Sequence, residues 1–128
     1  EGKEYSIDCG IAGSKINILI RKRIITFHGE SEFTRIEKNE LIKKNIIKAI
    51  NLFKFEGHFM FQGIISNKDK KFYITECNAR VGGMSIVSSL AGKDNVANFI
   101  AEKLKLKLKK KNIKTKNNFV VLRDIYSF

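Results

Sequence analysis

The chain has 128 residues, of which 43% are apolar and 30% are charged, and it contains no proline. This length accommodates one domain with a hydrophobic core, and the composition excludes wholesale disorder. No window approaches the roughly 20 apolar residues of a membrane span, so no membrane partner is expected. The two cysteines are too few for a disulfide framework or a structural zinc site, which favours a reducing, cytoplasmic setting.

The formal net charge of +12 would by itself suggest a nucleic-acid-binding protein. Eight of the lysines, however, lie in residues 103–116, a segment without any acidic residue. Because most of the positive excess belongs to one segment, the charge is weak evidence about partners. A solvated helix end and linker is the first interpretation of residues 105–116. A basic module whose tail contacts nucleic acid is the alternative.

The N-terminal part of the chain predicts a β-hairpin. Residues 4–9 alternate in polarity, residues 12–14 form a turn, and residues 15–21 give a second strand that residues 24–27 are compatible with continuing. Residues 28–37 are polar and are expected to be irregular.

A helix is predicted next, over residues 38–53, followed by a second hairpin. The helix carries one apolar stripe, formed by Ile42, Ile46, Ala49, Ile50 and Phe53. Strands rich in aromatic and β-branched residues are predicted at 59–65 and 72–77, joined through residues 67–70.

The C-terminal part predicts two helices and a strand. Residues 85–91 form a short helical candidate, and Asp94 caps a further helix with the apolar stripe Val96, Phe99, Ile100 and Leu104. Residues 119–122 predict a last strand. This order of elements indicates an α+β fold, an antiparallel sheet with helices packed on one face. The expected divisions are a main unit at 1–104, a Lys-rich helix end and linker at 105–117, and a terminal strand at 118–128.

Polar side chains gather at the end of the strand at 72–77. Successive side chains of a strand point to opposite faces, so Glu76, Asn78 and Arg80 share one face, while Cys77 is expected in the core behind it. Magnesium prefers oxygen ligands and often bridges phosphates, and arginine binds phosphate or carboxylate oxygens bidentately. One sheet edge could therefore hold a metal and its anion. A solvated polar strand end is the alternative.

Gln62 adds a fourth polar group, 14 residues before Glu76 on the partner strand. A three-residue turn at 68–70 would set Gln62 opposite Glu76, with their Cβ atoms about 4.5–5.5 Å apart. A two- or four-residue turn would set Gln62 opposite Thr75 instead, and an exposed strand glutamine is then the interpretation.

Gln62, the 14-residue gap, the Glu76-x-Asn78-x-Arg80 motif and the following Gly-Gly together resemble the C-terminal lobe of the ATP-grasp superfamily. The branch they resemble most is that of the carbamoyl-phosphate synthase large subunit and related carboxylate–amine ligases. The resemblance covers about residues 2–104 and also draws on the segments 2–8, 20–24, 29–31 and 90–95.

The resemblance implies an enzyme that uses ATP with magnesium (or manganese) to phosphorylate a small carboxylate. An amine or similar nucleophile then attacks the acylphosphate. In this scheme Gln62 and Glu76 bind one metal ion and belong to the nucleotide-binding residues, Glu76 and Asn78 bind a second ion, and the catalytic Arg80 contacts the phosphates or the acylphosphate.

The resemblance also assigns nucleotide-binding roles to three residues of the first hairpin. Glu4 would reach the nucleotide near its ribose. Arg21 and Arg23 share a strand face and would contact phosphate or the acid substrate, two exposed cations being the alternative. The family usually has proline at the position of Ala79, and its nucleotide-covering lobe precedes this one. The chain is therefore expected to be a fragment that lacks the N-terminal lobe and is inactive alone.

Overall fold

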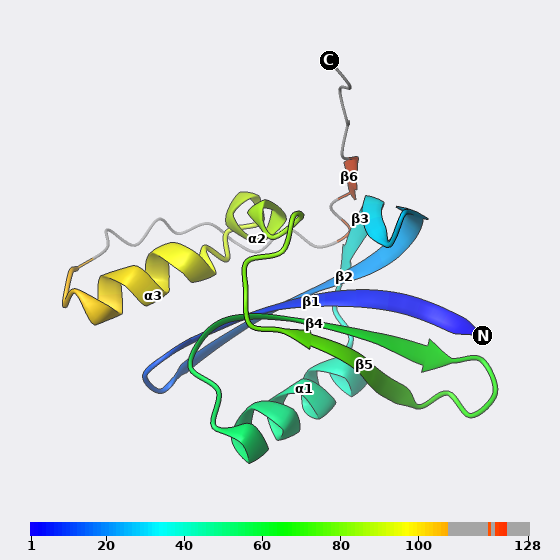
Figure 1. The fold of residues 1–128 in the computed structure, drawn as a ribbon, viewed down its shortest axis with the longest axis horizontal. Helices are drawn as coiled ribbons and strands as arrows, with labels where there is room; N and C mark the ends of the chain where they lie inside the picture. The colour runs from blue at the N-terminus through cyan, green and yellow to red at the C-terminus, as the bar shows by residue number, and fades with distance from the viewer. Residues whose placement is uncertain (108–117, 119, 123–128) are drawn as a thin grey trace.

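The computed structural model of the chain describes residues 1–107, 118 and 120–122. Its sheet has the strand order β5-β4-β1-β2-β3-β6, and every neighbouring pair is antiparallel (Figure 1). Among the described residues no helix combines the length and the apolar character needed to cross a membrane. The elements in chain order are β1 (Gly2–Ala12), β2 (Lys15–Phe27), β3 (Glu30–Glu37), α1 (Glu40–Phe53), β4 (Gly57–Ser66), β5 (Phe72–Asn78), α2 (Ile86–Leu90), α3 (Asn95–Lys103) and β6 (Val120–Leu122).

The first hairpin is confirmed, and a third strand extends it. A two-residue turn joins β1 to β2, and β2 runs on to Phe27. The irregular segment expected at 28–37 is wrong, because β3 occupies most of it and pairs with β2. His28 and Gly29 form the connecting turn with φ of 46° and 78°. Two positive φ values are typical of the type I′ turn, whose twist matches that of the flanking strands.

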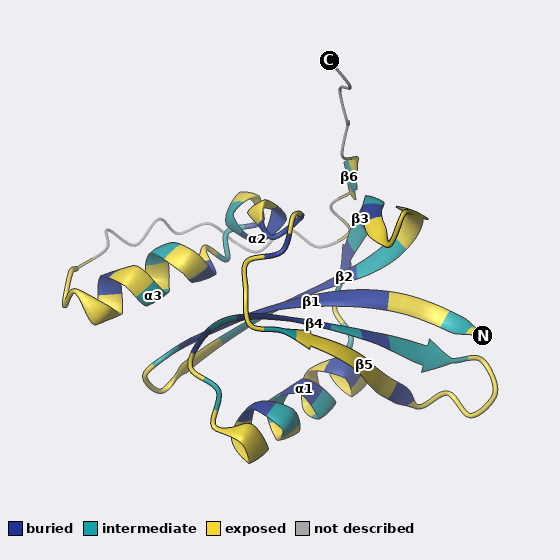
Figure 2. Ribbon diagram, in the orientation of Figure 1, coloured by how far each residue is buried: buried dark blue, intermediate teal, exposed yellow. Residues whose placement is uncertain are grey.

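Helix α1 covers one face of the sheet. Asn39 caps it, since its side-chain oxygen accepts a hydrogen bond from the Ile42 backbone N–H at 3.1 Å. Ile42, Ile46 and Ile50 of the predicted stripe are buried and Ala49 is partly buried, whereas Phe53 is 66% exposed, so the buried stripe ends one turn early (Figure 2). The helix packs on inward-facing residues that include Tyr5, Ile7, Cys9, Ile20, Phe59, Phe61 and Phe72.

Helices α2 and α3 lie on the opposite side of the sheet from α1 (Figure 1). The α+β class and the antiparallel sheet are confirmed, but the helices cover both faces, where the sequence predicted one. Val87 and Ala91 of the α2 region pack with Leu19 of β2 and Ile36 of β3. This second apolar cluster explains the arrangement, because it buries apolar side chains of β2 and β3 on the face of the sheet that α1 does not cover.

The face that α3 buries differs from the predicted one. Asn95 and Ala101 are buried, whereas Val96, Ile100 and Leu104 of the predicted stripe are 38%, 49% and 62% exposed. Asp94 caps the helix as predicted, accepting a hydrogen bond from the Ala97 N–H at 3.0 Å. Gly10 permits the close approach to β1, since a Cβ there would lie 2.6 Å from the Asn95 Cβ.

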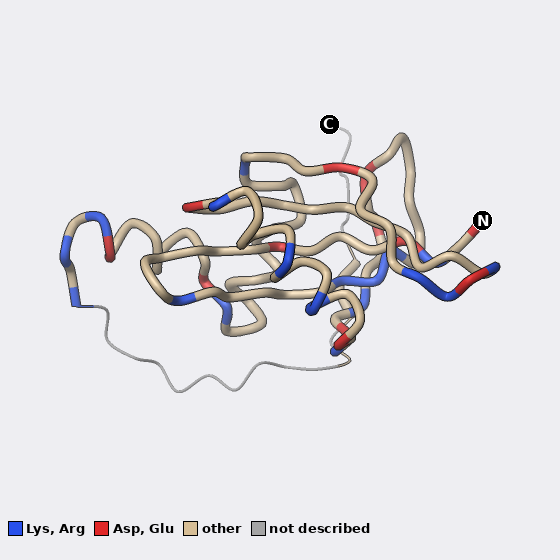
Figure 3. Tube along the Cα trace, turned by 90° about the horizontal axis from the view of Figure 1, so that it is seen from below, with Lys and Arg blue, Asp and Glu red and all other residues tan. Residues whose placement is uncertain are grey.

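The Lys-rich segment falls mainly outside the described residues, which omit 108–117. Beyond it, β6 pairs with β3. In the described part of the chain, lysine and arginine residues are spread over several segments, with acidic residues among them (Figure 3). The described residues therefore add nothing to the nucleic-acid alternative.

His58 lies beside Gly10 in the β1–β4 ladder, and neither ring nitrogen has a hydrogen-bond partner among the described residues. Burial lowers the pKa of His58. The negative charge of Asp8 raises this pKa in part, and the positive charge of Arg21 lowers it further. In the unfolded state the imidazole binds a proton below about pH 6.5, whereas in the folded state it binds a proton only at a lower pH. The unfolded state then carries more protons, so we expect the free energy of unfolding to fall as the pH drops from about 7 to 5.

Urea unfolding at several pH values measures this dependence, and His58→Gln should weaken it. The matched control is His28→Gln, because His28 lies in an exposed turn. Equal pH slopes for the wild type and His58→Gln would contradict the prediction.

Candidate functional site

The register of β4 and β5 sets Gln62 opposite Glu76, as predicted, but by another route. Ile65 pairs with Phe72, and the Ser66 N–H bonds to the Lys71 carbonyl at 3.0 Å, so the turn spans four residues. The predicted three-residue turn is therefore wrong, and a four-residue turn alone would set Gln62 opposite Thr75. A β-bulge at Thr75 shifts the register by one residue and restores the pairing.

Asn78 lies beside Glu76, as the strand alternation predicted. Its side-chain amide donates a hydrogen bond of 2.7 Å to the Glu76 carboxylate. Glu76 is exposed and Asn78 is partly buried. Two of the three proposed metal ligands are thus in contact, and the third, Gln62, faces Glu76 across the strand pair.

Arg23 connects β2 to this group and is not an exposed cation. Its guanidinium donates to the side-chain oxygen of Gln62 at 2.7 Å and to the Gly29 carbonyl at 2.6 Å. It also lies 3.5 Å from the carboxylate of Glu4, and its side chain is only 8% exposed. Glu4, Arg23 and Gln62 therefore form one chain of contacts across β1, β2 and β4.

Arg21 is buried as well, in an ion pair with Asp8. Its Nε and Nη2 donate to the two oxygens of Asp8 at 2.8 and 3.2 Å, and both side chains are at most 1% exposed. The alternative of two exposed cations on β2 is therefore wrong. The remaining nitrogen, Nη1, is buried without a hydrogen-bond partner among the described residues.

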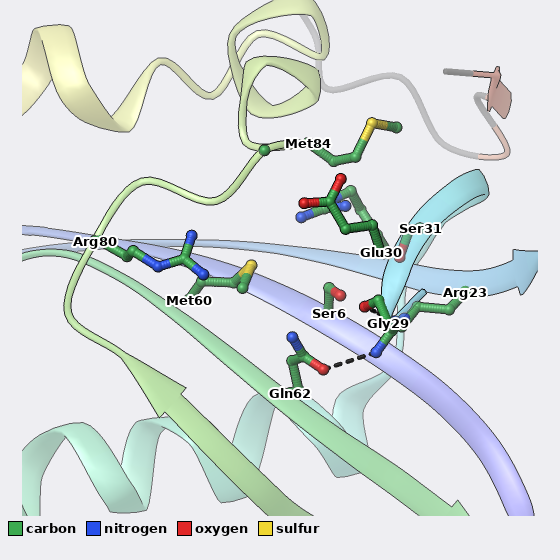
Figure 4. A pocket seen from close by; sticks show the side chains of 11 residues that line it. Ser6, Arg23, Gly29, Glu30, Ser31, Met60, Gln62, Arg80 and Met84 are labelled. Atoms are coloured by element: carbon green, nitrogen blue, oxygen red, sulfur yellow. Dashed lines mark hydrogen bonds between the residues drawn. The ribbon is translucent and has the colours of Figure 1, made fainter. Parts of the chain in front are cut away.

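A pocket lies where these strands meet the segment after β5 (Figure 4). Arg80, on that segment, and Arg23 lie on opposite sides of Gln62. The sequence did not single out Ser6 or Ser31, although Ser6 follows Glu4 at the strand period of two. The residues that line the pocket are Ser6, Arg21, Arg23, Gly29, Glu30, Ser31, Met60, Gln62, Arg80, Gly83 and Met84. The lining holds three guanidinium groups and one carboxylate, Glu30, and since Asp8 already neutralises Arg21, the cations that an anion would meet there are chiefly Arg23 and Arg80.

Cys77 does not lie in the core, contrary to the sequence prediction. It is exposed near the end of β5, an edge strand of the sheet, and Cys9 is the buried cysteine. Burial raises the pKa of the Cys9 thiol well above its ordinary value.

The family model described as ATP-grasp in the biosynthetic pathway with Ter operon matches residues 1–125. The chain belongs to the ATP-grasp family. A comparison with curated protein sequences gives no match. The family assignment confirms the resemblance that the Gln62, Glu76, Asn78 and Arg80 pattern suggested.

Solved structures of ATP-grasp enzymes share the fold. Biotin carboxylase from Campylobacter jejuni, in a complex with β-γ-ATP, matches with a TM-score of 0.66 and 17% identity over 85% of this chain and 26% of its own. The N5-carboxyaminoimidazole ribonucleotide synthetase PurK, in an ADP complex, gives 0.67 and 16% over 92% and 32%. The N5-carboxyaminoimidazole synthetase of Staphylococcus aureus, complexed with ADP, gives 0.61 and 19% over 94% and 32%. The chain thus spans about a quarter to a third of their length.

The residues of this ATP-grasp chain fit a magnesium ion by their donor chemistry. The described residues contain no group of three or more His, Cys, Asp or Glu side chains that could hold a metal. The candidate set combines one carboxylate, Glu76, with the amide oxygens of Gln62 and Asn78, which are hard ligands of the kind magnesium prefers. The Gln62 oxygen has two lone pairs, so its bond to Arg23 leaves one free for coordination.

Proposed function

We propose that the chain is the magnesium-binding lobe of a two-lobed ATP-grasp ligase, of the carboxylate–amine type that the carbamoyl-phosphate synthase large subunit represents. ATP would convert a small carboxylate into an acylphosphate, which an amine or similar nucleophile attacks. The observation that carries the proposal is the opposition of Gln62 and Glu76, with Asn78 bonded to Glu76, next to an arginine-lined pocket. The nucleotide complexes of the structural neighbours support it.

The proposed metal ligands differ in charge, and this sets their roles. Magnesium, when bound, would neutralise the charge of the transferring phosphoryl group. Glu76 brings the only negative charge of the set and lies between Gln62 and Asn78, so it would bridge two ions. Gln62 and Asn78 would each complete one coordination shell as neutral donors.

The arginines would hold the anions of the reaction in the pocket. Arg80 lines the pocket, is exposed, and would contact the phosphates or the acylphosphate, the catalytic role that we assign to it. Arg23 would reach the same anion while it orients Gln62. Arg21 would offer its unpaired Nη1, and Glu4 would contact the nucleotide near its ribose.

This lobe would supply only one wall of the nucleotide site, because phosphoryl transfer needs charge neutralisation from all sides of the triphosphate. We therefore expect the 128-residue chain to release no ADP from ATP above background. The complete protein with both lobes should release ADP when magnesium and the correct carboxylate are present.

The experiment measures ADP release by the chain and by the complete protein, with hydroxylamine added to trap acylphosphate as hydroxamate. A panel of small carboxylates serves as the probe. ADP release without any hydroxamate would contradict the acylphosphate step. Magnesium-dependent ADP release by the 128-residue chain, abolished in Glu76→Gln, would contradict the need for a second lobe.

A further inference from the structure

Asp8, at the centre of β1, has a role that the sequence did not suggest. Its carboxylate is fully buried and accepts four hydrogen bonds, two of them from Arg21. The other two come from the hydroxyl groups of Ser85 at 2.7 Å and Ser88 at 3.0 Å. A carboxylate has about four lone-pair positions, so the capacity of Asp8 is filled.

Ser85 links Asp8 to the segment that carries Arg80, because it is hydrogen-bonded to both Asp8 and Gly82. Its hydroxyl oxygen accepts a hydrogen bond from the Gly82 N–H at 2.9 Å, and its own N–H donates to the Gly82 carbonyl at 2.9 Å. The Gly82 backbone packs closely against Met60, since a Cβ at Gly82 would lie 2.5 Å from the Met60 sulfur. Ser88 bonds to the same carboxylate, but in the described part of the chain its hydroxyl makes no hydrogen bond to Gly82.

We propose that Asp8 is a positioning residue of the pocket. One buried carboxylate fixes the guanidinium of Arg21 directly and the segment of Arg80 through Ser85 and Gly82. Two cations on different elements, one on β2 and one after β5, are thereby held at a common anion before it binds. Such preorganisation lowers the cost of ordering the site during the reaction. The catalytic part of this inference rests on the proposed function.

Ser85→Ala and Ser88→Ala form a matched pair, since each removes one hydroxyl bond to Asp8 and only Ser85→Ala also removes the acceptor of the Gly82 N–H, while the backbone bond from Ser85 to the Gly82 carbonyl stays. We expect amide hydrogen exchange at Gly82, followed by NMR on the 128-residue chain, to quicken about fivefold in Ser85→Ala and to stay near the wild-type rate in Ser88→Ala. Equal exchange rates in the two variants would contradict the link from Asp8 through Ser85 to Gly82. A purely structural role would lower the unfolding midpoint of both variants alike and would not single out Gly82.

In the complete protein, Ser85→Ala should lower kcat for ADP release between about tenfold and a hundredfold, while Ser88→Ala stays close to wild type. An unchanged kcat in a Ser85→Ala protein with fast Gly82 exchange would overturn the positioning role. If the wild-type complete protein shows no ATP-dependent activity, the proposed function fails. The exchange comparison still tests, on its own, whether Ser85 links Asp8 to Gly82.

Discussion

We expect Glu76→Ala to reduce the ATP-dependent activity of the complete protein by more than about a hundredfold. Loss of a residue that only hydrogen-bonds to a metal ligand already lowers metal affinity or activity about 10–100-fold, and Glu76 is proposed to be a ligand itself. The reason is charge, because Glu76 is the only anion of the proposed ligand set and would serve two ions. Asn78→Ala should cost about tenfold, because it removes one neutral donor that water can replace. Steady-state ADP release at increasing magnesium concentrations measures both effects.

Glu32→Ala is the matched control, since it removes a carboxylate from β3, away from the β4–β5 pair. It should leave the magnesium dependence unchanged. A larger loss in Asn78→Ala than in Glu76→Ala would contradict the bridging role, and an unaltered magnesium dependence in Glu76→Ala would contradict metal binding at this edge altogether.

The second large effect concerns stability. We expect Arg21→Met to lower the free energy of unfolding of the 128-residue chain by about 3–5 kcal/mol, because it leaves the Asp8 carboxylate buried without its cation. The two serine hydroxyls that remain on Asp8 supply dipoles and no compensating charge. Urea unfolding followed by circular dichroism measures the change.

Lys43→Met controls for loss of a cation, since Lys43 pairs with Glu40 at 3.6 Å and both side chains are at least half exposed. Surface pairs of this kind contribute at most about 1 kcal/mol. If Arg21→Met costs no more than Lys43→Met, the buried pair is not the anchor that its geometry indicates.

The sequence predicted those elements whose signals are local. The two hairpins and α1 follow from alternation, turn residues and an apolar stripe, and each is present. Strand β3 was missed because its inward positions include Ser31 and Thr34, which are buried but polar. The two-residue turn His28-Gly29 was the available signal, since a flexible pair between two β-branched stretches is typical of a hairpin.

The candidate site was predictable in which residues lie together and only partly in its arrangement. Residue types and the 14-residue gap brought Gln62, Glu76 and Asn78 forward as neighbours, which they are, while their role as metal ligands stays a prediction. The burial of Arg21 could not be predicted, because it depends on Asp8 from a neighbouring strand and on α2 folding over both. The buried face of α3 was equally out of reach, since Gly10 and Asn95 fit together only once β1 and the helix are in place.

The bulge at Thr75 lets one short strand serve two different environments. Side chains alternate along a regular strand, so Phe72, Ile74 and Glu76 would all project to the same side. Phe72 is only 7% exposed among the apolar residues beneath α1, where a carboxylate would lose its water. The extra residue reverses the alternation, so that the first half of β5 anchors the core while the second half presents Glu76 to Gln62. A chain without Thr75 could place either the aromatic ring or the carboxylate correctly, but not both.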